Sequence, residues 1–273
     1  MSTSESRNRV VANRGGWLSG RTPFVILGAV LFVYVCYPFV AFLWRLDGFD
    51  SAAATDPATL SAVRYSLTTA PVATVLATVF GVPLAYVLAR SSFRGKSVVE
   101  ALVIVPLVLP PVVAGLLLLT GFGSLTPVGS FARSMGIRLT DSYVGIVLAQ
   151  TFVASPFVVI TSRAGFAGID DQLEEAARSL GSSPVETFWN VSVPLARNSI
   201  LAGIVLTFAR AVGEFGATML VAYHPHTMPV QIWVAFGSQG LDATVPLVVL
   251  LALIGFSVVF ALQALGRTPT LTR

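Results

Sequence analysis

Charged residues are scarce in this chain. Asp, Glu, Lys and Arg make up 11% of its 273 residues, whereas soluble domains carry roughly 25%. Hydrophobic residues make up 55%, and the mean hydropathy is +0.80. So few charges cannot cover a water-facing surface. The composition therefore excludes an ordinary soluble domain and predicts a protein embedded in a lipid bilayer.

Residues that hold metals or perform catalysis are also scarce. The single cysteine, Cys36, lies in an apolar run, which excludes a disulfide within the chain and a cysteine-based metal site. The two histidines, His224 and His226, flank a proline in a pattern more typical of a turn than of a metal site. The run RGKS resembles the end of a phosphate-binding loop, but Arg90 stands where that loop needs its first glycine. We therefore expect no metal, no cofactor, no catalytic residues and no P-loop.

Six apolar stretches are long enough to cross a bilayer, which takes about 20 helical residues. The third contains the run VPLVLPPVVAG, which predicts a bent or broken helix. The first follows a basic segment, as a secretory signal does, but its apolar run is longer, so we expect a retained helix. The predicted fold is an all-α membrane protein with six transmembrane helices. The spans are Pro23–Leu43, Ser66–Ala89, Ala101–Phe122, Tyr143–Ser162, Ser199–Ala222 and Ala243–Leu265.

The positive charges predict the orientation of these spans. Twelve lysines and arginines lie on the side that holds both termini and the loops after spans two and four. Lys and Arg accumulate in cytoplasmic loops. Both termini are therefore expected in the cytoplasm, in a multi-pass protein of the cell membrane. The opposite side has only Arg45, Arg64, Arg133 and Arg138.

The loop between the fourth and fifth predicted spans, residues 163–198, begins with the pattern of a short amphipathic helix. Asp170 caps its N-terminus, and further acidic residues follow in the first turn. Gly181 ends the helix, because glycine accepts the left-handed backbone conformation without steric cost. An apolar stripe at spacing i, i+3, i+4 and i+7 is formed by Leu173, Ala176, Ala177 and Leu180.

A second short helix is predicted directly after this glycine. Ser183 and Glu186 stand in capping-box positions, and Pro184 occupies the first helical position. Pro194 is expected to end the helix before the fifth span begins. One side of this helix is formed by Val185, Phe188 and Trp189.

The charge of this loop separates two interpretations. An amphipathic connector lying on the membrane would carry a lysine-rich polar face. Residues 170–190 instead contain five acids and one base, Arg178, and anionic lipid would repel them. The pattern favours a docking surface for a cytoplasmic partner.

The same loop resembles the E-A-A-x3-G-x9-I-x-L-P segment of permease subunits of bacterial and archaeal ABC importers. Valines at 191 and 193 replace the usual Ile and Leu. The resemblance covers about residues 60–265 and implies a type I importer (MetI-like) permease fold, whose loop docks into a cleft of a separate ATP-hydrolysing subunit. On this basis residues 1–22 and 266–273 are cytoplasmic tails, 23–43 the first transmembrane helix and 60–265 the permease core. The implied coupling residues are Glu174, Glu175, Ala176, Ala177, Gly181, Phe188, Trp189 and Pro194.

A narrower resemblance concerns the anion that is carried. The run FARAVGEFGATMLVAYHP, residues 208–225, is similar to the fifth span of permeases for tetrahedral oxyanions, and its continuation is most similar to archaeal-type tungstate and molybdate permeases. The run QTFVASPF, residues 150–157, agrees with the same branch. A sulfate or thiosulfate permease remains the alternative within the family.

Two charged residues inside the fifth span are informative about function independently of the family resemblance. Arg210 and Glu214 stand one helical turn apart near mid-membrane, where charges are costly and usually line a bundle interior or an aqueous path. A pair at i, i+4 also neutralises itself and fixes packing. Both interpretations stay open at this stage. Ala209, Gly213 and Ala217 form an adjacent stripe of small residues suited to close helix contact. The candidate pathway residues are Arg210, Glu214, Phe215, Gly216 and Thr218.

The resemblance implies a transport subunit rather than an enzyme. Its expected partners are a second permease copy, two ATP-binding subunits, an external substrate-binding protein and the lipid bilayer, without nucleic acid. Two other classes remain. A secondary anion transporter would show repeated halves with broken helices, and a membrane enzyme would need converging catalytic groups.

Overall fold

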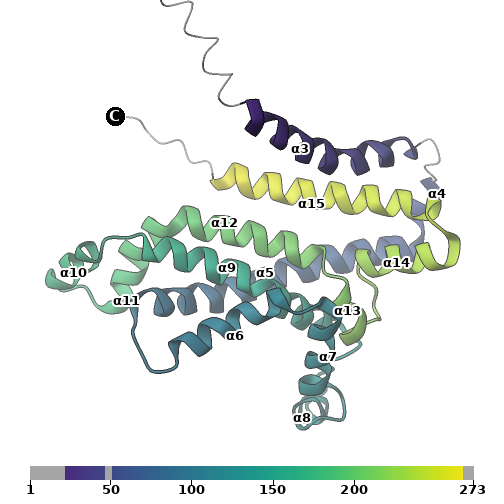
Figure 1. The fold of residues 1–273 in the computed structure, drawn as a ribbon. Helices are drawn as coiled ribbons and strands as arrows, with labels where there is room; N and C mark the ends of the chain where they lie inside the picture. Colours follow the sequence, from purple (N-terminus) through teal and green to yellow (C-terminus); the bar gives the residue numbers. More distant parts are fainter. Residues whose placement is uncertain (1–21, 47–50, 267–273) are drawn as a thin grey trace, which may run out of the picture. The chain divides into compact units, whose positions relative to one another are not determined.

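The computed structural model describes residues 22–46 and 51–266, without the side chains of 258–259 and 261–266. Every regular element in these ranges is a helix (Figure 1), as predicted. The two predicted tails lie outside the described residues except for Thr22 and Gly266. The helices are α3 (Thr22–Leu43), α4 (Ser51–Thr55), α5 (Pro57–Arg90), α6 (Lys96–Val108), α7 (Pro111–Phe122), α8 (Pro127–Ser134), α9 (Tyr143–Ala167), α10 (Asp171–Ser179), α11 (Pro184–Thr187), η2 (Phe188–Ser192), α12 (Val193–Val212), α13 (Gly216–Val221), α14 (Met228–Gln239), η3 (Asp242–Thr244) and α15 (Val245–Gly266).

The chain divides into two units, Met1–Phe49 and Asp50–Arg273. In the first unit, α3 is 22 residues long and has no buried residue. It is long and apolar enough to cross a membrane.

The count of six continuous spans is not reproduced. In the described residues, four helical stretches are long and apolar enough to cross a membrane: α3, α5, α9 and the continuous Pro184–Val212. The pair α7 and α8, bent by 62°, is a fifth stretch if it is taken as one span. The predicted sixth span coincides with α15. It is not among the four, because its stretch with described side chains, Asp242–Ser257, is a shorter apolar helix. The third and fifth predicted spans differ in another way, since the helix is broken in each.

The third span is broken, as its prolines predict. Helix α6 ends at Val108, Leu109 has an extended backbone, and α7 begins at Pro111. Proline tolerates the first helical position because the N–H it lacks has no partner there. Pro110 and Pro111 therefore stop one helix and start the next.

The fifth span is also broken, which corrects the prediction of one continuous helix over Ser199–Ala222. Helix α12 ends at Val212 and α13 begins at Gly216. A carboxylate oxygen of Glu214 accepts a hydrogen bond from the backbone N–H of Ala217 at 2.7 Å. This cap satisfies a donor at the start of α13 and stabilises the break.

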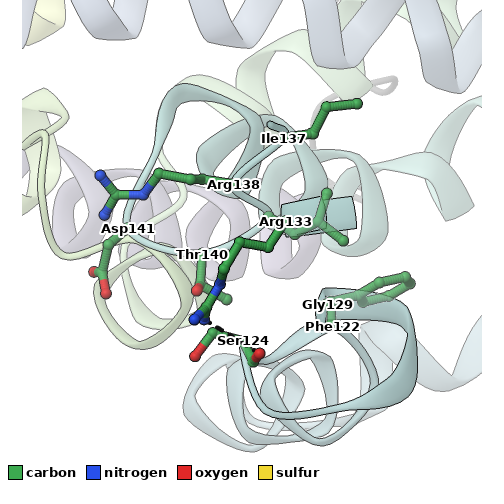
Figure 2. Close-up of a pocket in the computed structure, with 9 residues that line it drawn as sticks. Phe122, Ser124, Gly129, Arg133, Ile137, Arg138, Thr140 and Asp141 are labelled. Carbon is green, nitrogen blue, oxygen red and sulfur yellow. Dashed lines mark hydrogen bonds between the residues drawn. The ribbon is translucent and has the colours of Figure 1, made fainter. Parts of the chain in front are cut away.

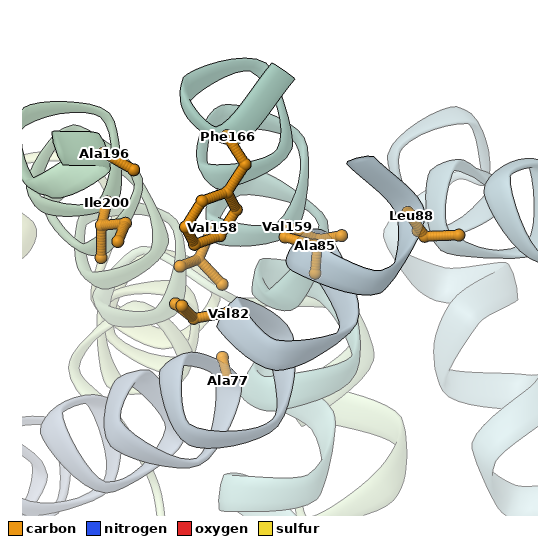
Figure 3. Packing of buried hydrophobic residues seen from close by; sticks show 9 residues of the cluster. All are labelled: Ala77, Val82, Ala85, Leu88, Val158, Val159, Phe166, Ala196 and Ile200. Atoms are coloured by element: carbon orange, nitrogen blue, oxygen red, sulfur yellow. The ribbon is translucent and has the colours of Figure 1, made fainter. Parts of the chain in front are cut away.

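The core of the second unit lies where α5, α9 and α12 pack together (Figure 3). Ala77 and Ala85 of α5 meet Val158 of α9 and Ile200 of α12 in one buried cluster, and Phe166 fills the end of it near α10. Small residues on α5 allow this close approach. A second cluster continues along the same three helices toward the end of α12.

Helix α13 packs closely against α7. A Cβ added to Gly216 would lie 2.7 Å from the Cβ of Pro111, so only glycine fits at this contact. Ala217 is fully buried in the same interface, whereas Ala209 and Gly213 are exposed. The predicted stripe of small residues is therefore divided, because the break places Ala217 on a different helix.

Candidate functional site

The first loop helix, α10, has the predicted start and stop. The side chain of Asp170 accepts a hydrogen bond from the backbone N–H of Gln172 at 3.0 Å. Gly181 adopts a φ of +98°, in the left-handed region that glycine favours. The N–H groups of Gly181 and Ser182 donate to the carbonyls of Arg178 and Ala177, closing the helix end as a Schellman motif.

The capping box of the second helix is also present. The backbone N–H of Ser183 donates to the carboxylate of Glu186 at 2.7 Å, and the backbone N–H of Glu186 donates to the hydroxyl of Ser183 at 3.3 Å. Glu186 lies at the polar end of this helix, outside its apolar part. Bonds from the backbone and side chain of Ser183 lower the pKa of the Glu186 carboxyl group.

The predicted end of the second helix at Pro194 is wrong. After α11 the chain forms a π-helical turn, Phe188–Ser192, and continues as α12 without interruption. Proline lacks an N–H and its ring clashes with the carbonyl four residues earlier in an α-helix. The wider i→i+5 turn leaves room for the ring, so Pro194 stands inside a helix that runs from Pro184 to Val212.

Much of the predicted docking surface is exposed. Leu180 is 89% exposed, and Trp189 is 61% exposed. Apolar side chains at these exposures favour a protein contact over contact with water. Of the predicted coupling residues, the exposed ones are Glu175, Ala176, Gly181, Trp189 and Pro194, and Ala177 is half-buried.

Glu174 is the main exception, because it points into the protein. It is 1% exposed, although its neighbour Glu175 is exposed. One carboxylate oxygen accepts hydrogen bonds from Arg90 Nε at 3.0 Å and Ser192 Oγ at 2.8 Å, and the other accepts one from the Tyr86 hydroxyl at 3.1 Å. Glu174 therefore joins α10 to the end of α5 and to the π-helical turn.

Arg90 extends this network to the start of the loop. Its guanidinium also contacts the Asp171 carboxylate at 2.5 Å and donates to the carbonyl oxygen of Ile169 at 3.1 Å. Arg90 and Tyr86 border a polar cavity of about 420 Å³ together with the acidic side of α10. No local pattern indicates this role. The contact spans 84 positions, and in the sequence Arg90 is only one of several cations at the end of a span.

Phe188 also faces inward. Its ring lies 4.9 Å from that of Tyr86 and 6.1 Å from that of Phe166, centroid to centroid. The predicted apolar side of the second helix is therefore divided. Phe188 anchors the loop to the core, while Val185 and Trp189 remain exposed.

The predicted charge pair is formed at the break between α12 and α13. Arg210 Nη2 lies 2.5 Å from Glu214 Oε2, and Glu214 is 1% exposed. Glu214 thus neutralises Arg210 and caps α13 with its other oxygen. Gly216 and Thr218 are buried in α13, and Phe215 packs against Trp233 of α14 at a ring distance of 5.6 Å.

The sequence profile of one protein family matches residues 81–269, more than half of the chain. The family is described as the binding-protein-dependent transport system inner membrane component. The chain belongs to this family.

Two relatives in the family are similar over nearly their whole length. A probable molybdenum ABC transporter permease protein of Haloferax volcanii is 47% identical over 251 residues, which cover 90% of each chain. A molybdate/tungstate transport system permease protein of Pyrococcus abyssi is 39% identical over 244 residues, covering 88% of this chain and 93% of the relative.

A solved structure shows the same fold. The structure of a bacterial ABC transporter for the import of the acidic polysaccharide alginate aligns with a TM-score of 0.70 at 17% identity, covering 97% of this chain and 99% of the other. The predicted all-α type I importer permease fold is therefore confirmed.

Proposed function

We propose that this permease is the membrane-spanning subunit of an ATP-driven importer for an inorganic oxyanion, with molybdate or tungstate as its cargo. The observation that carries the proposal is the exposed loop from Asp171 to Pro194, which presents acidic and apolar side chains at one end of the helical core. In a chain that carries no P-loop of its own, such a surface suits a separate ATPase subunit.

The assignment of the substrate rests on the relatives of this chain and on the Arg210–Glu214 pair. The two relatives described above are named for molybdenum and for molybdate and tungstate. Sulfate is the second candidate, because a probable sulfate transport permease of Chlorokybus atmophyticus is 37% identical over 247 residues. All these anions are tetrahedral and carry two negative charges, so one cationic route serves each of them.

The assembly contains two copies of this chain, two ATPase subunits and an external binding protein. The loop end of the core faces the cytoplasm. The cations Arg90, Lys96 and Arg163 gather at that end, where Arg163 pairs with Glu100 at 2.9 Å. Cations of this kind accumulate on the cytoplasmic side of membranes. Selectivity resides mainly in the binding protein, since the permease must release the anion.

The anion route passes the break between α12 and α13, near the axis of the permease dimer. Broken helices at membrane depth line cavities, because their free backbone groups need partners. Arg210 supplies a positive charge there, and Glu214 shields it between transport events.

The function is tested by uptake into proteoliposomes that contain the permease and its ATPase, with the binding protein added outside. We expect ATP-dependent accumulation of molybdate and tungstate, and its loss when the ATPase carries a substituted P-loop lysine. Uptake that persists with the inactive ATPase would instead identify a secondary carrier. Uptake of sulfate but not of molybdate or tungstate would assign this permease to the sulfate branch of the family.

The route is tested by Arg210→Leu, Glu214→Leu and the double variant, each assayed for uptake and for thermal stability. Arg210→Leu loses stability because the buried Glu214 is left unpaired, and Glu214→Leu because the partly buried Arg210 loses its partner and α13 loses its cap. The double variant recovers part of this stability. Uptake stays low in the double variant because the cation is missing. Wild-type uptake in a stable double variant would show that the pair is purely structural.

A further inference from the structure

A second cationic site lies at the opposite end of the core from the loop helix α10. Helix α9 begins here at Tyr143 and reaches the loop at Ala167. Between α7 and the start of α9, helix α8 and its flanking turns border an open cavity of about 400 Å³. The cavity is lined by Phe122, Ser124, Gly129, Arg133, Ile137, Arg138, Leu139, Thr140 and Asp141 (Figure 2).

Local hydrogen bonds fix the walls of this cavity. Thr126 caps α8 by accepting a hydrogen bond from Gly129 N–H at 3.1 Å. The Ser142 hydroxyl donates to the carbonyl of Arg138 at 2.6 Å and accepts from Gly145 N–H at 3.1 Å, so the turn is held against the start of α9. Arg133 and Arg138 are thereby presented from two separate segments of backbone.

The cavity carries an excess of positive charge. One nitrogen of Arg133 donates to the carbonyl oxygen of Ser124 at 3.2 Å, which leaves its other N–H groups available. Within the described part of the chain neither Arg133 nor Arg138 forms an ion pair. Figure 2 shows their polar ends on one side of the view with Thr140 and Asp141, and Phe122 on the other. The lining has two cations against one anion.

These groups suit a tetrahedral oxyanion. A guanidinium presents two parallel N–H donors that match two oxygens of such an anion. At about 30 Å³ per water molecule, a cavity of about 400 Å³ has room for the anion and part of its hydration shell. Asp141 repels the anion and so limits its affinity, as a site that must release its cargo requires.

The cavity is connected to the charge pair through α13. The backbone N–H of Asp141 donates to the carbonyl of Val221, the last residue of α13, at 3.0 Å. The first turn of α13 is capped by Glu214, the partner of Arg210. At 1.5 Å per residue the six residues of α13 span about 9 Å, so the two cationic sites lie near the two ends of one short helix.

We propose that this cavity is an anion-binding site on the outer side of the permease, where Arg133 and Arg138 receive a tetrahedral oxyanion before it moves toward Arg210. The inference rests on the proposed function and adds a receiving site to it. The site binds the anion weakly, so that it can release it toward Arg210.

The main experiment measures uptake and ATP hydrolysis together in proteoliposomes, with saturating molybdate-loaded binding protein. The variant Arg133→Gln/Arg138→Gln is expected to lower the molybdate imported per ATP by about tenfold, because charged hydrogen bonds to the anion are lost. The matched control is Arg64→Gln. This variant removes an exposed cation near the start of α5, at the same end of the core as the cavity. It should import as the wild type does. The variant Arg133→Lys/Arg138→Lys should retain part of the uptake.

Several outcomes would overturn the inference. Equal uptake per ATP in the glutamine variant and the wild type would show that the cavity is not an anion-binding site. The proposed importer function would not be affected. The glutamine variant could instead import a normal amount of molybdate per ATP but need more binding protein for half-maximal stimulation of the ATPase. That result would assign the arginines to docking of the binding protein. If wild-type proteoliposomes import no oxyanion at all, the proposed function itself fails.

A direct occupancy measurement does not depend on transport. Cys36 is the only cysteine, so Ser124→Cys in a Cys36→Ser background gives a single thiol in the cavity wall. In the permease–ATPase complex, sodium tungstate should slow the reaction of this thiol with an anionic methanethiosulfonate reagent. We expect protection of about threefold or more, lost in Arg133→Gln/Arg138→Gln and strengthened in Asp141→Asn. Equal protection in all three backgrounds would contradict the site.

Discussion

At the scale of single residues, two adjacent carboxylates in the loop have opposite roles. Glu175 is exposed and available to a partner, whereas Glu174 is buried and holds the loop to α5 and to the π-helical turn. The buried carboxylate is stabilised by Arg90, whose side chain is 14% exposed. Such a pair is costly to break, because the largely buried Arg90 would keep only the exposed Asp171 as a charged partner and would gain little water.

We therefore expect Glu174→Gln to lower the free energy of unfolding of the purified permease by about 3–5 kcal/mol, the range for breaking a buried ion pair. Glu175→Gln is the matched control and should leave the melting temperature unchanged. Thermal unfolding followed by circular dichroism in detergent distinguishes them. Equal melting temperatures for both variants would contradict the role of Glu174.

The sequence predicts the loop residue by residue only where the interactions are local. The cap at Asp170, the left-handed Gly181 and the Ser183–Glu186 box all involve neighbours within a few positions, and all three are confirmed. The burial of Glu174 depends on Arg90, 84 positions earlier. The helical pattern of the loop does not indicate a partner so distant in the sequence, so this contact could not be predicted.

At the scale of elements, prolines are informative at one site and misleading at another. Pro110 and Pro111 separate α6 from α7 as predicted, but Pro194 lies inside a continuous helix because a π-helical turn accommodates it. The break after Val212 was missed for the opposite reason, since no proline marks it. A capping carboxylate and close packing of α13 on α7 stabilise it instead.

The packing of α13 is tested by Gly216→Ala. The added methyl group would lie 2.7 Å from Pro111, so α13 and α7 must move apart. We expect a loss of stability of about 1–3 kcal/mol, as for overpacked cores. The control is Gly121→Ala in α7, where an added Cβ meets no atom within 4 Å. It should leave the melting temperature unchanged, and a destabilisation as large as that of Gly216→Ala would contradict the packing argument.

At the scale of the whole molecule, the exposed loop makes a prediction about assembly. Trp189 is 61% exposed on the proposed docking surface. Trp233 is 50% exposed and lies elsewhere, beside Phe215 at the break after α12. Docking of the ATPase should bury Trp189 and leave the surroundings of Trp233 unchanged.

Two single-tryptophan versions of the permease test this, each with the other three tryptophans replaced by phenylalanine. Fluorescence of the Trp189 version should shift to shorter wavelength when the ATPase subunit is added, because the indole leaves water. The Trp233 version should not respond. A shift confined to Trp233 would place the ATPase contact elsewhere.

We expect the unbroken helix from Pro184 to Val212 to act as a lever. Its 29 residues form a rod about 43 Å long, with the proposed docking surface at one end and Arg210 at the other. The buried Ala196 and Ile200 fix it against α5 and α9 near its middle, which makes that contact the fulcrum. A tilt of about 10° about this point would move the two ends in opposite directions by about 4 Å each. That displacement exceeds the 2.5 Å between Arg210 and Glu214, so we expect a small tilt driven from the loop to separate the pair.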